Sequence, residues 1–242
     1  MVQLTTKNSD LEINLQGAYV TSLNYARKEV LFSAQKLGEK LRGGVPVCAP
    51  VFGPGESVGL AQHGFARDIE WEVLSRNENE VKLTPVKNQS QVKMLPRAYQ
   101  MMSMQLMIKL QEDTLTMCLG IKNDGSENIV VSPGFHPYFY TTDATNVTVQ
   151  SDITRRFTAE QLLATQFLPP HQNKVSFMSQ ENVAVTIQSE SLQQYAVWSA
   201  NPDKYICVEP TMGGYLEHQP NPPVLQPGAF QTYDMTISWR EV

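Results

Sequence analysis

The sequence predicts an all-β protein, a large antiparallel β-sandwich. Hydrophobic residues recur at every second position in short runs, and turn-forming clusters such as QEDT, KNDGSEN and SRNENE separate these runs. Helical periodicity is scarce. The 242 residues are 41% hydrophobic, which is enough to bury a sizeable core. Because sandwiches of this length routinely fold as one unit, we expect residues 1–242 to form a single domain.

The expected strands follow one another along the chain. Alternation marks five segments, which are LEINL (11–15), IEWEV (69–73), LTMCLGI (115–121), VAVTI (183–187) and YDMTISW (233–239). In IEWEV the pattern puts Ile69, Trp71 and Val73 on one face. Segments 104–110 and 114–121, joined by Gln111-Glu112-Asp113, predict a hairpin.

Two other segments carry distinct local signals. TAEQLLATQFL begins with Thr158 and has a T-x-x-Q capping pattern, which predicts a turn or two of helix. The proline-rich QPNPPVLQPG (219–228) is typical of an ordered loop before a last strand.

Composition excludes several classes of protein. The cysteines Cys48, Cys118 and Cys207 are far apart and form no CxxC pair, which argues against a zinc ribbon or a disulfide scaffold and suits a reducing cytosol. The net charge of −5 disfavours nucleic-acid binding. No apolar run approaches the roughly 20 residues that span a bilayer, and the N-terminus lacks the pattern of a secretory signal. We expect a cytoplasmic protein with no nucleic-acid or membrane partner.

The four histidines fall into two groups. His171 and His218 lie in polar segments beside prolines, so we expect both on the surface. His63 in QHGFAR and His136 in SPGFHPYFY lie among glycines and aromatic residues. His63 and Arg67 share a face whether the chain is extended or helical. These two histidines either serve chemistry or are half-buried groups that satisfy the backbone.

A metal site is not expected from the spacing of the histidines. A zinc or cupin-like site requires clustered ligands such as H-x-H or H-x-x-x-H, and neither spacing occurs in the chain. A two-histidine site completed by a distant carboxylate stays open as an alternative, but no pattern in the sequence favours it. We therefore expect no metal and no cofactor.

Glu209 and Arg42 complete the set of candidates. Glu209 follows the strand-like run YICV, where partial desolvation raises the pKa of a carboxylate and makes it a plausible base. Arg42 precedes two glycines in LRGGVPVCAPVFGPG, and small neighbours let a guanidinium approach a phosphate or carboxylate closely. The alternatives are a solvated glutamate at a strand end and a surface arginine beside a turn.

Together these segments resemble the aldose 1-epimerase superfamily. RGGVPVCAPVFGP, QHGFARDIEWEV, GFHPYF and YICVEP occur in the order and approximate spacing of that superfamily, and are most similar to its hexose-6-phosphate mutarotase branch. The similarity extends to LQEDTLTMCLGIKNDGSENI and LQPGAFQTYDMTI, and so covers nearly the whole chain. It implies a sandwich of the galactose-mutarotase type, with the site on one concave sheet face.

The resemblance also implies roles for particular residues. Glu209 would be the base on the C1 hydroxyl of a sugar and His136 the acid at the ring oxygen, and His63 would form a hydrogen bond in the same region and help to polarise it. Such an acid and base need no metal. The implied substrate contacts are Arg42, Arg67, Gln62 and Trp198, the two arginines holding a phosphate. Trp198, in YAVWSANPD, would pack on the sugar ring, and the alternative is a core tryptophan.

Two departures from the family pattern bear on the substrate. Ala49 and Val51 replace aromatic residues, which implies a different pocket floor. QNKVSF aligns with a family segment T-D-R-[VI]-Y, so Asn173 would replace an acidic residue that helps to hold the sugar.

The expected function is mutarotation of a hexose 6-phosphate such as glucose 6-phosphate, by a monomer or weak homodimer. Two alternatives remain open: a mutarotase for a neutral aldose, and a non-catalytic carbohydrate-binding or sensing protein on the same scaffold. A glycoside hydrolase fits less well, because it needs two carboxylates and only Glu209 lies in a suitable motif.

Overall fold

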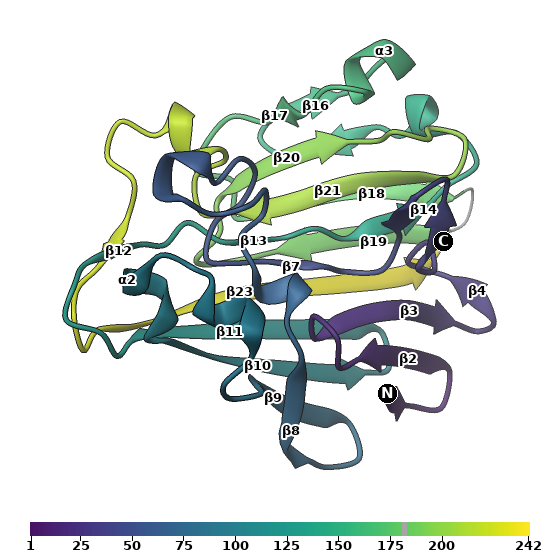
Figure 1. Cartoon of the computed structure of the whole chain (residues 1–242). Coiled ribbons are helices and arrows are strands. Elements are labelled where there is room, and N and C mark those ends of the chain that lie inside the picture. The colour runs from purple at the N-terminus through teal and green to yellow at the C-terminus, as the bar shows by residue number, and fades with distance from the viewer. Residues whose placement is uncertain (181–182) are drawn as a thin grey trace.

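The computed structural model describes residues 1–180 and 183–242. Its largest element is an antiparallel sheet (Figure 1), which has nine strands within these residues. The strands lie in the order β16 (Thr154–Arg155), β15 (Val149–Gln150), β18 (Lys174–Gln180), β19 (Val183–Gln188), β23 (Phe230–Glu241), β11 (Thr114–Asn123), β10 (Met102–Gln111), β9 (Glu80–Pro85) and β8 (Trp71–Arg76).

A second, six-stranded sheet within the described residues carries most of the motifs singled out above. Its order is β17 (Gln166–Phe167), β20 (Gln194–Trp198), β21 (Tyr205–Thr211), β13 (Gly134–Phe135) and β7 (Val47–Cys48), and β14 (Tyr138–Tyr140) also pairs with β21. Smaller sheets join β1 (Val2–Thr5), β2 (Ser9–Asn14), β3 (Tyr19–Tyr25) and β4 (Lys28–Glu29), then β5 (Gln35–Leu37) with β6 (Lys40–Arg42), and β12 (Ile129–Val130) with β22 (Val224–Leu225).

Helices are short, as the scarcity of helical patterns predicts. The α-helices are α1 (Ser90–Lys93), α2 (Arg97–Gln100) and α3 (Ala159–Leu162), and the 3-10 turns are η1 (Glu56–Val58), η2 (Ala66–Asp68), η3 (Ala144–Asn146) and η4 (Leu216–His218). The helix predicted after Thr158 is confirmed as α3, with a full capping box between Thr158 and Gln161. Over the described residues, no helix has the length and apolar character to cross a membrane.

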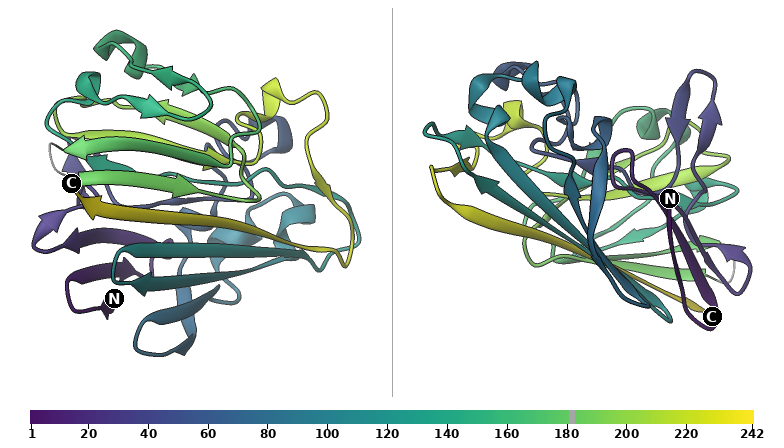
Figure 2. Two further views of the ribbon diagram at one scale, coloured as in Figure 1. Left: turned by 180° about the vertical axis from the view of Figure 1, so that it is seen from behind. Right: turned by 60° about the horizontal axis from the view of Figure 1, so that its bottom comes forward.

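The predicted hairpin is confirmed as β10 and β11. These strands run side by side with β23 in one twisted sheet (Figure 2), and Gln111 pairs with Thr114 at the turn. The alternating residues are buried on one face, which is the physical reason for the period of two. They are Met104, Leu106, Ile108 and Leu110 on β10 and Leu115, Met117, Leu119 and Ile121 on β11.

The inner faces of the two large sheets pack against each other. Phe139 on β14 and Phe177 on β18 meet edge to face across this interface, with ring centroids 5.0 Å apart. One cluster of buried residues runs through both sheets, from Val2 to Trp239. The predicted antiparallel sandwich is therefore confirmed.

One residue of the predicted alternation is not buried. Ile69 and Trp71 are buried, but Val73 is 41% exposed. The register from Trp71 to Val73 is regular, and Val73 pairs with the buried Leu83, so Val73 keeps the face of Trp71. β8 is the edge strand of the nine-stranded sheet, so that Val73 has a neighbouring strand on one side alone and stays accessible to solvent.

The burial pattern makes a testable contrast between a central and an edge strand. Leu106→Ala on β10 should reduce the free energy of unfolding by about 2–5 kcal/mol, because it removes fully buried methyl groups and leaves a cavity. Val73→Ala on β8, the matched control, should change it by no more than about 0.5 kcal/mol. Urea denaturation at pH 7 measures both, and equal losses would contradict the assignment of β10 to the core.

Candidate functional site

The outer face of the six-stranded sheet carries a pocket of about 680 Å³. Residues from β6, η2, β20 and β21 line it, together with the segments around them. All seven residues that the sequence analysis singled out as site residues lie in its wall: Arg42, Gln62, His63, Arg67, His136, Trp198 and Glu209. The pocket thus unites motifs that lie up to 167 positions apart, from Arg42 to Glu209.

His63 is held by a short loop of left-handed backbone. Its φ is 66°, and its backbone N–H donates to the carbonyl of Gly53 over 2.7 Å. In return the Gly53 N–H donates to Nδ1 of His63 over 3.0 Å. Gly53 itself has φ of 77° and lies so close to Tyr215 that an added Cβ would be 2.1 Å from the ring. This position therefore requires glycine.

The hydrogen bond from the Gly53 N–H determines which ring nitrogen of His63 carries the proton. A ring nitrogen that accepts a hydrogen bond carries no proton, so the neutral ring bears its proton on Nε2. Burial, followed by the positive charges of Arg67 and Arg42, lowers the pKa of His63 to about 3. His63 is thus a neutral hydrogen-bond donor at ordinary pH, and the centre of its ring lies 5.5 Å from that of His136.

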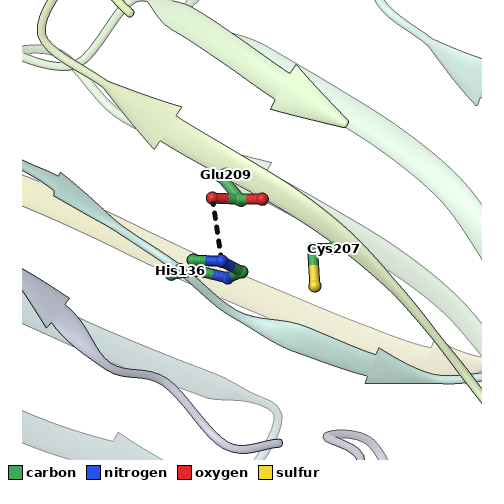
Figure 3. A group of neighbouring side chains, drawn as sticks. All are labelled: His136, Cys207 and Glu209. Atoms are coloured by element: carbon green, nitrogen blue, oxygen red, sulfur yellow. Dashed lines mark ion pairs between the residues drawn. The ribbon is translucent and has the colours of Figure 1, made fainter. Parts of the chain in front are cut away.

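His136 and Glu209 form a buried pair at the floor of the pocket (Figure 3). Nε2 of His136 lies 3.5 Å from Oε2 of Glu209, and the residues are 6% and 1% exposed. β21 contributes Glu209, while the backbone N–H of His136 donates to the carbonyl of Pro46. His136 also stacks on Tyr138, two residues later, with the ring planes 6° apart.

The pair has unused hydrogen-bonding capacity. Among the described residues, neither Nδ1 of His136 nor Oε2 of Glu209 has a hydrogen-bond partner, although both atoms are buried. Native proteins seldom leave buried polar atoms unpaired, because each costs roughly 1–3 kcal/mol. Burial raises the pKa of Glu209 well above its usual value and lowers the pKa of His136 well below its own. The free protein therefore favours a protonated Glu209 beside a neutral His136.

Two arginines lie at different walls of the pocket. The Arg42 guanidinium lies 5.0 Å from the centre of the Trp198 ring, a cation–π contact, and donates to the Tyr138 hydroxyl over 3.5 Å. Arg67 donates to the backbone carbonyl of Gln62 over 2.9 Å. A guanidinium has five N–H donors, so each of these contacts leaves capacity for an anionic ligand.

Trp198 packs against buried aromatic residues and also lines the pocket, so both alternatives for it apply in part. It is partly buried against an aromatic cluster that includes Tyr138 and Tyr205, yet its ring also lines the pocket. The ring meets His136 edge to face, with centroids 5.8 Å apart, and its Nε1 donates to the carbonyl of Leu163. The ring is thereby fixed in orientation beside the His136–Glu209 pair.

The exposed histidines are as predicted, but three other expectations are not met. His171 and His218 are both exposed. Asn173 is exposed at the start of the segment leading into β18, on the other sheet, and does not line the pocket. Ala49 and Val51 belong to the main core and do not form the pocket floor. The similarity of local segments could not reveal which sheet Asn173 adjoins, or that the side chains of Ala49 and Val51 pack into the core.

The structure adds pocket residues that the sequence reasoning missed. Asp68 follows Arg67 in the same motif, and burial raises the pKa of its carboxyl. Tyr138 lies two positions after His136, so a period of two could have placed it on the same side. Lys40 enters from the β5–β6 hairpin, and nothing in the sequence around it signals this position.

The neutrality of buried His63 predicts a pH-dependent loss of stability. The pKa of His63 is near 6.5 in the unfolded chain and about 3 in the folded protein. Below pH 6.5 the unfolded chain therefore binds a proton that the folded protein does not, and the free energy of unfolding decreases as the pH is lowered. At pH 5 the loss is about 2 kcal/mol. His63→Asn should remove this loss, because asparagine tolerates positive φ but does not titrate.

Urea denaturation of wild type and His63→Asn at pH 7 and pH 5 measures the difference. His171→Asn is the matched control, since His171 also has positive φ, at 65°, but is exposed; this variant should follow wild type. A wild type and a His63→Asn variant with the same pH dependence would contradict a buried, neutral His63.

Comparisons with known proteins agree with the fold and with the motifs. The model of the aldose 1-epimerase family matches residues 1–227. A protein of Salmonella typhimurium named as a candidate glucose-6-phosphate 1-epimerase is 44% identical over 71 residues, which are 27% of this chain and 24% of that protein. A similarly named protein of Cenchrus ciliaris is 29% identical over 165 residues, covering 60% of this chain and 47% of its own. These matches span less than half the length of either relative.

Solved structures match over nearly the whole chain. A galactose mutarotase related enzyme from Lactobacillus acidophilus superposes with a TM-score of 0.84 at 18% identity, covering 99% of this chain and 97% of that one. A galactose mutarotase-like protein from Lactobacillus casei gives a TM-score of 0.85 at 17% identity, covering 99% and 100%. At these identities the likeness establishes the fold, a sandwich of the galactose-mutarotase type.

Proposed function

This chain belongs to the aldose 1-epimerase family, and we propose that it interconverts the α and β anomers of a hexose 6-phosphate. The observation that carries the proposal is the pair of buried, unpaired atoms, Nδ1 of His136 and Oε2 of Glu209, in a pocket that also holds a fixed donor, His63. A bound sugar would supply partners for these atoms and so offset the cost of leaving them unpaired.

The proposed chemistry needs one acid and one base. Glu209 takes the proton of the C1 hydroxyl while His136 gives a proton to the ring oxygen; the bond between C1 and the ring oxygen breaks, and C1 becomes an aldehyde carbon. Rotation about the bond between C1 and C2, then closure with both proton transfers reversed, gives the other anomer. His63 donates from Nε2 to an oxygen near C1 and stabilises the charge that develops there.

The proton distribution of the free protein matches the open-chain stage of the proposed reaction. After ring opening Glu209 is protonated and His136 is neutral, and burial favours that same distribution without a ligand. The site is therefore electrostatically matched to the open-chain aldehyde. Hydroxyl donors of a cyclic sugar stabilise the Glu209 carboxylate and return the pair to its ionised form.

The phosphate assignment rests on the cations of the pocket. Arg42, Arg67 and Lys40 all line it, and a guanidinium suits bidentate binding of phosphate. An anionic group held away from C1 orients the sugar toward the acid and the base. We place this reaction in the cytoplasm, where the unpaired thiols of Cys48, Cys118 and Cys207 persist.

Asp68 favours a second candidate, a mutarotase for a neutral aldose. Its carboxyl lines the pocket beside Arg67, whose charge lowers the Asp68 pKa against the larger effect of burial. A carboxylate here accepts hydrogen bonds from sugar hydroxyls and repels a phosphate. Arg67 would then pair with Asp68 and donate hydrogen bonds to sugar hydroxyls, and would not bind a phosphate.

The rate of anomer exchange, measured by saturation-transfer NMR, tests the proposal. We expect faster exchange of glucose 6-phosphate, and Glu209→Gln should reduce the enzymatic rate by about 10²–10⁴-fold because it removes the base. Free glucose and galactose are measured beside it. Acceleration of the neutral sugars alone would favour the second candidate. Binding of sugars without any acceleration would contradict catalysis and favour a sensor.

Arg67→Ala tests the phosphate contact separately. A charged hydrogen bond is worth roughly 1.5–3 kcal/mol, so kcat/KM for glucose 6-phosphate should fall about 10–150-fold, with a smaller effect on glucose. Arg97→Ala is the matched control, because Arg97 is exposed on α2 and does not line the pocket. Equal losses for the two sugars would argue against a phosphate bound by Arg67.

The pH profile of kcat/KM tests the proton distribution. An ordinary glutamate base and histidine acid, with pKa values of 4.5 and 6.5, would confine activity to a narrow bell between them. With the Glu209 pKa raised and the His136 pKa lowered, the pair keeps one proton over a wider range, and the active fraction stays constant across it. We expect a flat profile that extends beyond both limits. A maximum confined between pH 4.5 and 6.5 would contradict the buried pair.

A further inference from the structure

Next to His136 and Glu209, but not among the residues that line the pocket, lies a third group that the proposed reaction does not use, the thiol of Cys207. One nitrogen of His136, the sulfur of Cys207 and one carboxylate oxygen of Glu209 all lie within 4.8 Å of one another, and all three residues are buried (Figure 3). Cys207 and Glu209 lie two positions apart on β21, so both side chains project from the same face of the strand. His136 comes from the adjoining segment.

The spacing of these atoms is close to that of a metal site. Around a tetrahedral zinc ion, with bonds of about 2.0–2.3 Å, neighbouring ligand atoms are about 3.4–3.6 Å apart. His136 and Glu209 already have this separation, at 3.5 Å. The limit of 4.8 Å on the remaining pairs means that the sulfur has to approach by about 1.4 Å at most. Rotation of the Cys207 and Glu209 side chains covers a movement of this size.

The identity of the donors selects the kind of ion. Magnesium and calcium prefer ligands that are all oxygen. Imidazole, thiolate and carboxylate together suit zinc and its substitutes cobalt and cadmium. A carboxylate and a thiolate supply two negative charges, which balance a divalent ion despite the nearby positive charges of Arg42 and Arg67.

The hydrogen bonding of Glu209 is a second observation that favours a ligand at this cluster. Among the residues described, Oε2 of Glu209, the oxygen that lies 3.5 Å from Nε2 of His136, is buried and has no hydrogen-bond partner. Both residues line the pocket, so an ion that enters the pocket reaches them directly. The fourth coordination position would then face the pocket and be open to water.

We propose that zinc binds to His136, Cys207 and Glu209 and closes the pocket to sugars. Binding forms bonds from zinc to the sulfur, the imidazole nitrogen and a carboxylate oxygen, and releases two protons to solvent, one from the Cys207 thiol and one from the Glu209 carboxyl. The bound ion occupies the lone pairs of His136 and Glu209, which the proton transfers require. Zinc is therefore an inhibitor that competes with the sugar. The binding half of this proposal is independent of the proposed function, whereas the inhibition half rests on it.

Cobalt(II) gives a direct test of binding. The protein is stripped with a chelator, kept anaerobic with a phosphine reductant, and titrated with cobalt chloride. We expect one ion per chain and a sulfur-to-cobalt charge-transfer band in the near ultraviolet, which zinc chloride then displaces. Cys207→Ser and Cys207→Ala should lose the band and weaken zinc binding at least about 10-fold. Two variants are used because a serine hydroxyl in this buried position could itself disturb folding.

Cys118→Ser is the matched control, since Cys118 lies on β11 of the other sheet and should keep the band. The absence of a charge-transfer band in wild type, or a band that survives in the folded Cys207→Ala variant, would overturn the site.

The inhibition half is measured by anomer exchange with added zinc chloride. We expect zinc to raise the apparent KM of wild type, and Cys207→Ala to keep its activity while becoming at least about 10-fold less sensitive. Zinc that binds but accelerates exchange would overturn the inhibitory role. If no exchange activity is found in any condition, the proposed function fails while the cobalt spectrum still decides the metal site.

Discussion

The alternation of side chains along β21 is the constraint on which the rest of the site depends. Ile206 and Val208 belong to the core between the sheets, while Cys207 and Glu209 project toward the opposite face. A slip of one residue would exchange these faces, burying a carboxylate in the core and exposing two β-branched side chains. Pairing with β20 on one side and with β13 and β14 on the other fixes this register.

The fixed register makes the burial of ionisable groups possible. Glu209 and His136 are desolvated because strands and aromatic rings surround them, including Tyr138 and Trp198. Burial of these groups costs free energy, and only a rigid scaffold can hold them in place. In exchange, burial raises the pKa of Glu209 and lowers the pKa of His136. Shifts in these directions let a carboxyl and an imidazole share one proton over a wider range of pH.

The same arrangement underlies both of the ligands that we propose for this pair. A sugar hydroxyl and a soft metal ion both seek lone pairs that water does not already occupy. His63 is excluded from the metal cluster because its Nδ1 accepts from Gly53, so that its free nitrogen bears a proton. The strained loop around Gly53 and His63 thus distinguishes His63, a hydrogen-bond donor alone, from the buried pair of His136 and Glu209.

The sequence by itself determined the class of fold and seven of the residues that line the pocket. Period-two burial, as on β10 and β11, is a local property, and contiguous motifs such as QHGFAR keep their residues together wherever the chain goes. It could not decide the exposure of Val73, the exclusion of Asn173 from the pocket, or the inclusion of Lys40. These depend on which strand is an edge and which sheet a segment joins. Nor could histidine spacing reveal the cluster of His136 with Cys207 and Glu209, because residues 71 and 73 positions apart meet only when β14 pairs with β21. Pairing between distant strands, and the desolvation that follows from it, is a property of the tertiary structure alone.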